Sequence, residues 1–341
     1  MTPKKQNILI TGGAGFIGAN FVYKFLELGY QVHVLEMKSA NLWRIKKIHP
    51  VKSASQNEAV SRQAGQFNGV KNKIKLHNID LTNYKETQKA IFKINPDIVL
   101  HFATYGAYQR FQQDINLTID TNIKGTINLI NACNKIGVEC FINTGTNSEY
   151  GIKDKPMKET DLLEPDNLYA ITKASATMYC QMMAQKFDFP VVIMRPFAVY
   201  GPFEEKERLI PTIIKSCLKN NDLQLSSPDS VRDFIFIDDV ISAYILAIKN
   251  IKKVKGEIFN LGTGKQHTVS QIVAMVKKIT HSDLNPIYGK VKKAQTEPKM
   301  WVADISKAKK KLGWKIKYGL EEGLKKNIQW YKENLFLDER K

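Results

Sequence analysis

The chain has 341 residues, of which 43% are hydrophobic and 25% charged, a composition that excludes a mainly disordered protein and allows one large α/β domain with a smaller lobe. Its formal net charge of +18 suits anionic partners, but no nucleic-acid-binding motif accompanies that charge, so we expect no nucleic-acid partner. The four cysteines are widely spaced and no apolar run is long enough to span a bilayer, which argues against a disulfide framework and a membrane protein and predicts a cytoplasmic location.

Short runs rich in Ile and Val alternate with amphipathic segments, a pattern typical of a parallel sheet covered by helices. The predicted strands are Asn7–Thr11, Gln31–Glu36, Ile74–His77, Asp97–Phe102, Glu139–Thr144 and Val191–Arg195. The predicted helices are Phe16–Leu28, Lys85–Ile94, Asn116–Ile136 and Asn167–Phe187. This order predicts an α/β fold with a Rossmann-like, doubly wound parallel sheet.

A glycine-rich turn, Gly12-Gly-Ala-Gly-Phe-Ile-Gly18, follows the first predicted strand and precedes the first predicted helix. This context is the one that a dinucleotide-binding turn requires. Gly12 and Gly15 let backbone N–H groups and the helix N-terminus approach a diphosphate, and Gly18 lets the helix pack closely on the strand. The turn therefore predicts a dinucleotide cofactor, the alternative being a tight turn without a ligand.

Two acidic positions follow the second and third predicted strands. Glu36 can accept hydrogen bonds from the adenosine ribose and repels a 2'-phosphate, which favours NAD over NADP. Lys38, Ser39 and Arg44 lie just downstream and could instead hold that phosphate, so NADP stays possible. Asp80-Leu81 is placed to meet the adenine, although Asp80 could equally cap the helix that follows.

Tyr169 and Lys173 lie four residues apart near the start of a predicted long helix and therefore project from one face of it. A tyrosine with a pKa of about 10 is a poor base at neutral pH, and a neighbouring ammonium favours its phenolate. Such a pair can also be an ordinary surface feature. Beside the glycine turn and the strand order, we interpret it as an acid/base catalyst for a dinucleotide-dependent reaction.

The alternation of strands and helices weakens after Arg195, where Pro and Gly become frequent. We therefore predict a Rossmann domain over residues 1–195 and roughly 235–262, and a smaller C-terminal substrate-binding lobe over residues 196–234 and 263–341. Ala40–Asn72 has the weakest pattern and is expected to hold a loop or a short helix.

These motifs together resemble the extended short-chain dehydrogenase/reductase family, the NAD-dependent epimerases and dehydratases of nucleotide sugars, over nearly the whole chain. The residues that carry the resemblance are Gly12–Gly18, His101–Thr104, Asn122, Thr144–Gly151, Tyr169 with Lys173, Arg195–Pro202 and Arg232–Asp239. Finer features, Ala103–Gly106, Gly201–Pro211 and Leu261–Gly264, most resemble the CDP-abequose synthase type of 4-ketoreductase.

The resemblance implies a role for each matching residue. Thr146 completes a Thr-Tyr-Lys triad and hydrogen-bonds the reacting sugar oxygen, Asn122 holds the proton-relay geometry, and Arg232 clamps the pyrophosphate of the substrate. The expected cofactor-binding residues are Gly12, Gly15, Phe16, Ile17, Gly18, Glu36, Asp80, Leu81, Phe102, Ala103, Thr104, Asn122, Tyr169 and Lys173. The expected substrate-binding residues are Thr146, Asn147, Arg208 and Arg232, and no metal ligands are expected.

The chain also departs from the family pattern. Family dehydratases carry an acid two residues after the catalytic Thr, where this chain has Ser148, preceded by Asn147. Glu149 is one residue further on, and a strand-like backbone would turn it to the other face, whereas a loop would undo that argument. We therefore expect no dehydration. Ala198 replaces an Asn of many family epimerases, which argues against a conventional galactose-type epimerase.

We therefore expect NAD(P)-dependent hydride transfer at C4 of a nucleotide-diphosphate sugar, namely reduction of a 4-keto-6-deoxyhexose with Tyr169 donating the proton. One alternative is a 4-epimerase with tightly bound NAD, which Glu36 favours. Another is a non-catalytic NAD(P) sensor, against which the presence of both Tyr169 and Lys173 argues. The resemblance further implies a homodimer in which residues 116–136 and 167–187 form a four-helix bundle, although these amphipathic helices could equally pack on their own sheet.

Overall fold

The computed structural model describes residues 6–46, 74–107, 114–291 and 298–334. The chain divides into two compact units, and the following lists give their segments. Unit 1 comprises Met1–Gly151, Leu162–Arg195 and Tyr244–Phe259, and unit 2 comprises Ile152–Asp161, Pro196–Ala243 and Asn260–Lys341. Most of Ala40–Asn72, expected to hold a loop or a short helix, lies outside the described residues.

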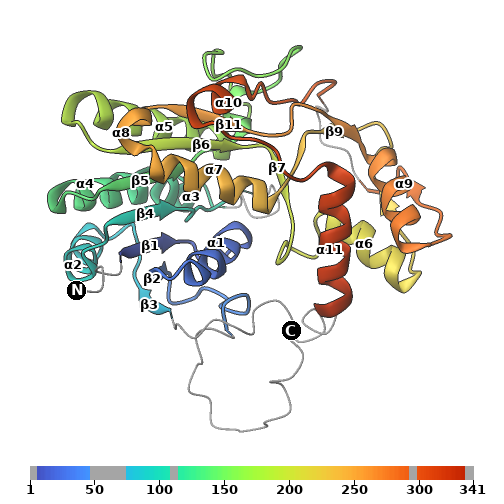
Figure 1. Ribbon diagram of the computed structural model, residues 1–341, viewed down its shortest axis with the longest axis horizontal. Coiled ribbons are helices and arrows are strands. Elements are labelled where there is room, and N and C mark those ends of the chain that lie inside the picture. The colour runs from blue at the N-terminus through green and yellow to red at the C-terminus, as the bar shows by residue number, and fades with distance from the viewer. Residues whose placement is uncertain (1–5, 47–73, 108–113, 292–297, 335–341) are drawn as a thin grey trace, which may run out of the picture. The chain divides into compact units, whose positions relative to one another are not determined.

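One sheet of seven strands has the order β11-β6-β5-β4-β1-β2-β3, and Figure 1 shows its strands side by side. The strands are β1 (Asn7–Thr11), β2 (Gln31–Glu36), β3 (Lys75–Asn78), β4 (Ile98–His101), β5 (Cys140–Thr144), β6 (Val191–Pro196) and β11 (Ile258–Leu261). The pairs β1–β2, β1–β4, β2–β3, β4–β5 and β5–β6 are parallel. The predicted Rossmann-like fold is confirmed, and the six predicted strands are present with ends moved by at most one residue.

Helices pack on both faces of this sheet. They are α1 (Phe16–Glu27), α2 (Tyr84–Ile94), α4 (Thr126–Ile136), α5 (Leu168–Phe187), α7 (Ile237–Lys249) and the short α8 (Ile251–Val254). Apolar residues of α2, α4 and α5 form one buried cluster with strand residues such as Phe141. On the other face, Phe21 of α1 lies with its ring centroid 4.6 Å from that of Phe102 and 4.7 Å from that of Tyr244. Burial of each large apolar side chain contributes about 1.5–3 kcal/mol to the stability of the fold. The helices on both faces of the sheet therefore hold the strands, and their ends, in place.

The long helix predicted over Asn116–Ile136 is interrupted, which corrects the prediction of one continuous helix. It consists of α3 (Ile115–Ile119), the π-helix η3 (Asp120–Gly125) and α4. The π-helix contains Asn122, which is 1% exposed and whose side chain hydrogen-bonds outside its own helix. A π-helical turn is rare and occurs most often at functional sites, so this interruption directs attention to Asn122.

Unit 2 is assembled from short strands and helices around buried polar residues. Its elements are β7 (Ala198–Tyr200), α6 (Leu209–Lys219), β8 (Gln224–Leu225), β9 (Val231–Arg232), β10 (Phe234–Phe236), β12 (His267–Thr268), α9 (Val269–Thr280), β13 (Ile287–Tyr288), α10 (Ser306–Leu312) and α11 (Leu320–Asn334). The Asp233 carboxylate, which is buried, accepts hydrogen bonds from the amides of Thr263, Gly264 and Ala303. This one side chain thereby fixes two loops next to Arg232.

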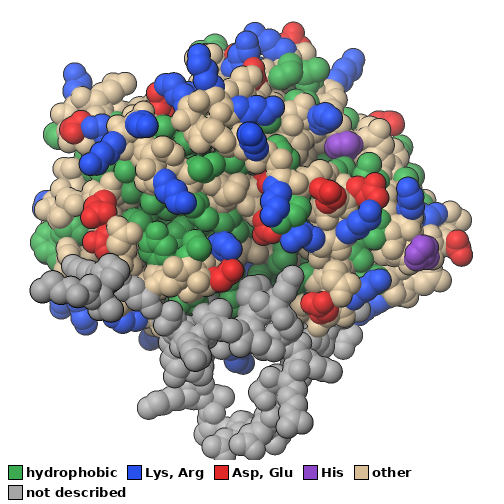
Figure 2. All heavy atoms as spheres, viewed as in Figure 1, with side chains coloured by type: hydrophobic (Ala, Val, Ile, Leu, Met, Phe, Trp, Pro, Cys, Tyr) green, Lys and Arg blue, Asp and Glu red, His purple; other side chains and the backbone are tan. Residues whose placement is uncertain are grey.

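On the face drawn in Figure 2, Lys and Arg side chains are spread among acidic, polar and apolar groups rather than gathered in one patch. Among the described residues, no helix combines the length and the apolar character that a membrane crossing would need.

Candidate active site

The glycine turn between β1 and α1 has the shape of a diphosphate cradle. Gly12 has φ +68°, and a Cβ there would lie 2.6 Å from the Ala103 nitrogen. A Cβ on Gly18 would overlap the Gly12 carbonyl oxygen. Gly15 is the N-cap of α1, and no side chain caps that helix end, so its first N–H groups can receive an anion. These residues fit the diphosphate of a dinucleotide.

Two side chains, Glu36 and Arg44, form hydrogen bonds with the backbone of Ala14 and thereby hold this turn in place. The Glu36 carboxylate accepts a hydrogen bond from the Ala14 N–H at 2.6 Å, and burial raises the pKa of Glu36 to about 7. The buried Arg44 donates to the Ala14 carbonyl at 3.3 Å, and its own carbonyl accepts from the Tyr23 hydroxyl. Glu36 and Arg44 are therefore both fixed beside the position predicted for the adenosine ribose.

Asp80 does not cap the helix that follows it, so that alternative is wrong. The N-cap of α2 is Asn83, whose side chain accepts from the Glu86 amide at 3.3 Å. Asp80 accepts from the Thr82 amide at 2.9 Å, which closes a tight turn after β3. Leu81 is buried in the core, and its carbonyl accepts from Asn128. The predicted contact of Asp80 and Leu81 with adenine stays a prediction.

A buried hydrogen-bond chain runs from the end of β1 to η3 through His101. Its Nδ1 lies 2.7 Å from the Thr11 hydroxyl and its Nε2 lies 2.9 Å from the Thr126 hydroxyl. Thr126 donates to the Asn122 carbonyl, so its oxygen accepts the Nε2 proton of a neutral imidazole. Burial lowers the pKa of His101 to about 3, which keeps the ring neutral. Sequence reasoning matched His101 to a motif but missed this role.

Asn122 binds the loop after β4, where three cofactor-binding residues, Phe102, Ala103 and Thr104, were predicted. Its Oδ1 accepts from the Thr104 hydroxyl at 3.0 Å and from the Tyr105 amide at 2.8 Å. Its Nδ2 donates to the Tyr105 carbonyl and to the Thr172 hydroxyl on α5. Asn122 thus joins the β4 loop to the helix that carries Tyr169, one turn from Thr172.

The predicted triad residues come from two elements that pack against each other. Thr146 is 8% exposed and is the N-cap of the 3-10 helix η4 (Asn147–Tyr150), which contacts α5. Tyr169 and Lys173 lie in the first turns of α5, which begins where the sequence predicted a helix. Burial lowers the pKa of Lys173 to about 8, and the Glu149 carboxylate opposes that shift. The catalytic roles of these residues stay predictions.

The backbone at Glu149 is a 3-10 helix, so the expected strand-like segment is wrong. The side chain is fully buried. Its Oε1 accepts from the Thr146 amide at 2.8 Å, and its Oε2 accepts from Arg195 Nε at 2.9 Å and lies 2.7 Å from Arg195 Nη2. Sequence reasoning missed both contacts. The spacing of Thr146-Asn-Ser-Glu149 is that of a capping box and could have indicated the bond to the Thr146 amide, but not the ion pair with Arg195.

The predicted substrate-binding arginines belong to unit 2, whereas the other predicted site residues belong to unit 1. Arg232 donates to the Val231 carbonyl at 2.6 Å, and its guanidinium carbon lies 5.6 Å from the centre of the Trp301 ring. Arg208 is the N-cap residue of α6 and forms an ion pair at 3.1 Å with Glu204, whose side chain is 2% exposed. Both guanidinium groups are thus oriented by neighbours within their own unit.

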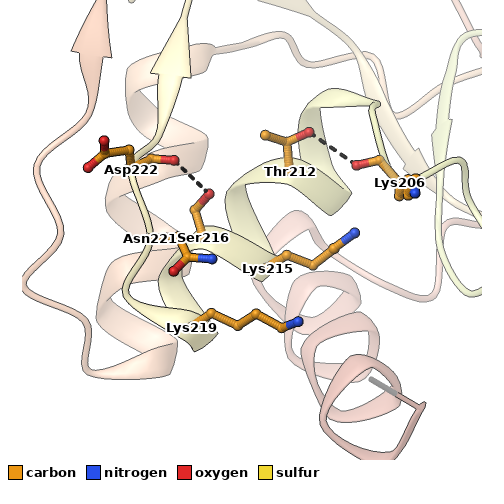
Figure 3. A pocket seen from close by; sticks show the side chains of 7 residues that line it. All are labelled: Lys206, Thr212, Lys215, Ser216, Lys219, Asn221 and Asp222. Atoms are coloured by element: carbon orange, nitrogen blue, oxygen red, sulfur yellow. Dashed lines mark hydrogen bonds between the residues drawn. The ribbon is translucent and has the colours of Figure 1, made fainter. Parts of the chain in front are cut away.

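Unit 2 also has an open, basic depression of 330 Å³ beside α6. Its lining residues are Lys206, Thr212, Lys215, Ser216, Lys219, Asn221 and Asp222. Figure 3 shows the side chains of Lys215 and Lys219 extending to the same side of α6. None of the predicted site residues lines this depression, so it is separate from the predicted site.

Comparison with known proteins finds similar chains and similar folds. The chain is 28% identical to the mouse dTDP-D-glucose 4,6-dehydratase over 96% of this chain and 89% of the relative. Its fold matches a solved UDP-glucose 4-epimerase from Thermotoga maritima with UDP-glucose, with a TM-score of 0.82, 28% identity and coverage of 97% and 100% of the two chains.

A second solved structure is a UDP-glucuronic acid 4-epimerase variant from Bacillus cereus in complex with NAD and UDP-4-deoxy-4-fluoro-glucuronic acid. It matches with a TM-score of 0.81, 28% identity and coverage of 96% and 99%. The model of the NAD dependent epimerase/dehydratase family matches residues 8–262. This chain therefore belongs to the NAD dependent epimerase/dehydratase family.

Proposed function

We propose that this protein transfers a hydride to or from C4 of a nucleotide-diphosphate sugar, using Thr146, Tyr169 and Lys173. The observation that carries the proposal is the packing of α5, with Tyr169 and the buried Lys173, against the η4 segment that begins at Thr146. The glycine turn of the same unit fits a dinucleotide, and the similar dehydratase and epimerases named above act on nucleotide sugars, which supports the same reaction class.

The side chains divide the acid/base work among them. Bound NAD supplies the hydride acceptor, or in its reduced form the donor. The Tyr169 phenol gives a proton to the C4 oxygen when a ketone is reduced and takes it back when the alcohol is oxidised. The Lys173 ammonium favours the phenolate form of Tyr169, and the Thr146 hydroxyl donates a hydrogen bond to the C4 oxygen as negative charge develops there.

Dehydration is disfavoured because the groups near Thr146 do not offer a free acid and base. Asn147 and Ser148 carry no ionisable group, and the Glu149 carboxylate is engaged by the Thr146 amide and by Arg195. Eliminating water across C5 and C6 requires an acid/base pair beyond the triad. The proposed chemistry is therefore confined to C4.

Two directions of this C4 chemistry have separate support. Reduction of a 4-keto-6-deoxyhexose is supported by the motif Ala103–Gly106 and by Ala198, which replaces the Asn of many family epimerases. Epimerisation at C4 is supported by Glu36, which suits tightly held NAD, and by the similar epimerases. The absorbance of reduced nicotinamide during turnover distinguishes them, because a reductase consumes external NADH or NADPH stoichiometrically and an epimerase consumes none.

For the substrate, we place the diphosphate of the nucleotide sugar with Arg232 and Arg208. A guanidinium can donate two hydrogen bonds to phosphate oxygens, and the stacking of Arg232 with Trp301 and the pairing of Arg208 with Glu204 pre-orient these donors. Replacing Arg232 by Lys should raise KM for the nucleotide sugar more than it lowers kcat, because a single ammonium cannot reproduce the bidentate geometry.

We also place a second copy of this chain on α3 and α5, as a four-helix bundle. Four apolar side chains on these two contacting helices are exposed: Ile115 at 61%, Ile119 at 39%, Ile171 at 47% and Met178 at 57%. When a partner covers large apolar side chains on neighbouring helices, their removal from water stabilises the complex. The same feature argues against the alternative in which these faces are buried within the chain.

A further inference from the structure

The buried ion pair between Glu149 and Arg195 takes no direct part in the proposed chemistry. Its Glu149 carboxylate nevertheless contacts Thr146, one of the three residues to which that chemistry is assigned. We propose that Glu149 is a positioning residue: its carboxylate, held by Arg195, fixes Thr146 and presents a negative charge to Lys173. This inference rests on the proposed function of the triad. It assigns to Glu149 a role that is neither that of a general acid nor that of a substrate ligand.

The Glu149 carboxylate is held in one position by its partners on both oxygens. Glu149 is 0% exposed and the Arg195 side chain is 1% exposed. Arg195 donates to Oε2 from Nε at 2.9 Å, with Nη2 at 2.7 Å from the same oxygen, while Oε1 accepts from the Thr146 amide at 2.8 Å. Thr146 is the N-cap of η4, and its amide is bound to the Glu149 carboxylate. The ion pair therefore fixes the backbone of Thr146 and, with it, the Thr146 hydroxyl.

The surrounding side chains enclose the pair and restrict its movement. The Arg195 guanidinium carbon lies 4.6 Å from the centre of the fully buried Tyr150 ring. At Gly145, a Cβ would overlap Glu149 Oε1 and lie 3.2 Å from Arg195 Cγ. Only glycine at position 145 admits the carboxylate at its observed place. The residue before Thr146 and the aromatic ring after Glu149 are thus both matched to this ion pair.

The second part of the proposal is electrostatic. Besides Tyr169, its partner in the proposed chemistry, the titratable groups that interact with Lys173 are Glu149 from η4, Cys180 from its own helix and His101 from β4. His101 is neutral at physiological pH and the buried Cys180 thiol keeps its proton, since burial raises the pKa of Cys180. Glu149 is therefore the carboxylate among these groups, and it stabilises the Lys173 ammonium against the cost of burial.

Stability alone does not require an ion pair at this place. Taking two charges out of water costs free energy that their attraction offsets only when the geometry is good, and apolar side chains of similar size are often as stabilising. An apolar pair could neither accept the Thr146 N–H nor act on Lys173. The observed pair does both, which is what distinguishes it from a purely structural feature.

The test is Glu149→Gln, which keeps an oxygen for the Thr146 amide and removes the charge. Titration of the Lys173 side chain, followed by NMR of lysine labelled with ¹³C at Cε in the cofactor-free protein, should give a pKa lower by about one unit than in the unaltered protein. In the active enzyme, the alkaline limb of the kcat profile should move to lower pH by a similar amount, with KM changed less than about threefold.

Two further variants keep this test decisive. If the unpaired Arg195 prevents Glu149→Gln from folding, Glu149→Gln with Arg195→Met removes both charges, and the lowered pKa of Lys173 should persist. The control is Asp239→Asn in unit 2, which removes another buried, hydrogen-bonded carboxylate and should lower Tm without shifting the Lys173 titration. An unchanged Lys173 titration in a folded Glu149 variant would overturn the proposal, whereas an inactive but normally titrating unaltered protein would count only against the proposed function.

Discussion

At the scale of single residues, burial sets the protonation of the groups nearest the predicted cofactor. It lowers the pKa of Lys173 to about 8 and of His101 to about 3, and it raises that of Glu36 to about 7. Charged forms lose hydration in the interior, so bases release their protons and acids retain theirs.

Replacing Tyr169 by Phe should lower kcat by about 100- to 10,000-fold, because the proton donor at the C4 oxygen is lost while the ring remains. Cofactor affinity should stay within about threefold. The matched control is Tyr179→Phe on the same helix, where the hydroxyl donates to Asn131 instead. Near-normal turnover by the Tyr169 variant, measured with the true nucleotide sugar, would contradict its assignment.

The preference for NAD over NADP should depend on pH through Glu36. Its pKa of about 7 means that the carboxyl is largely neutral at pH 6 and largely ionised at pH 8, and only the ionised form repels a 2'-phosphate. The ratio of the two dissociation constants, measured by calorimetry, should therefore favour NAD more strongly as pH rises. In Glu36→Gln the preference should weaken by about tenfold at pH 8 and lose this part of its pH dependence.

At the scale of elements, the strands of the sheet and the helices that cover it could be predicted from local sequence patterns, whereas η3 and η4 were not predicted. Alternating apolar runs and helical spacing are local signals, and they placed β1, β2 and α5 to within a residue. Within η3, Asn122 donates a hydrogen bond to Thr172, 50 positions away, and Glu149 of η4 accepts one from Arg195, 46 positions away. No local propensity encodes such partners.

Asn122→Ala should lower the free energy of unfolding by about 3 kcal/mol, because the Tyr105 amide and carbonyl and the Thr172 hydroxyl lose a buried partner. Urea unfolding measures this change. Asn131→Ala, on neighbouring α4, removes one partly buried hydrogen bond and should cost about 1 kcal/mol. Equal losses in the two variants would contradict the larger contribution assigned to the hydrogen bonds of Asn122.

The exposed faces of α3 and α5 make a prediction about assembly. Met178→Lys, at a position 57% exposed, should convert a dimer into a monomer in sedimentation velocity, since a charge would be buried at the interface. Phe92→Lys on α2, at a position 49% exposed, is the control and should leave the dimer intact. A protein that is monomeric before any substitution contradicts the four-helix-bundle arrangement.

At the scale of the whole molecule, family membership narrows the reaction without specifying it. Proteins that match nearly the full chain include both a dehydratase and epimerases, because one fold can carry several related reactions. The glycine turn and the Tyr169–Lys173 pair could be predicted from the sequence since their spacing is local. The surroundings of Glu149 and His101 could not, because their partners Arg195, Thr11 and Thr126 are distant in sequence.

Transfer of hydrogen at C4 is the most direct measurement of the proposed reaction. Nucleotide sugars with deuterium at C4, and 4-keto sugars with deuterated NADH, are incubated with the enzyme and the products analysed by NMR. We predict that at least one of them yields a product whose C4 deuterium has been moved or delivered by the enzyme, and that Tyr169→Phe suppresses this. The proposal is contradicted if none of these substrates gives a product formed by transfer of the C4 deuterium, or if that transfer persists undiminished without the Tyr169 hydroxyl.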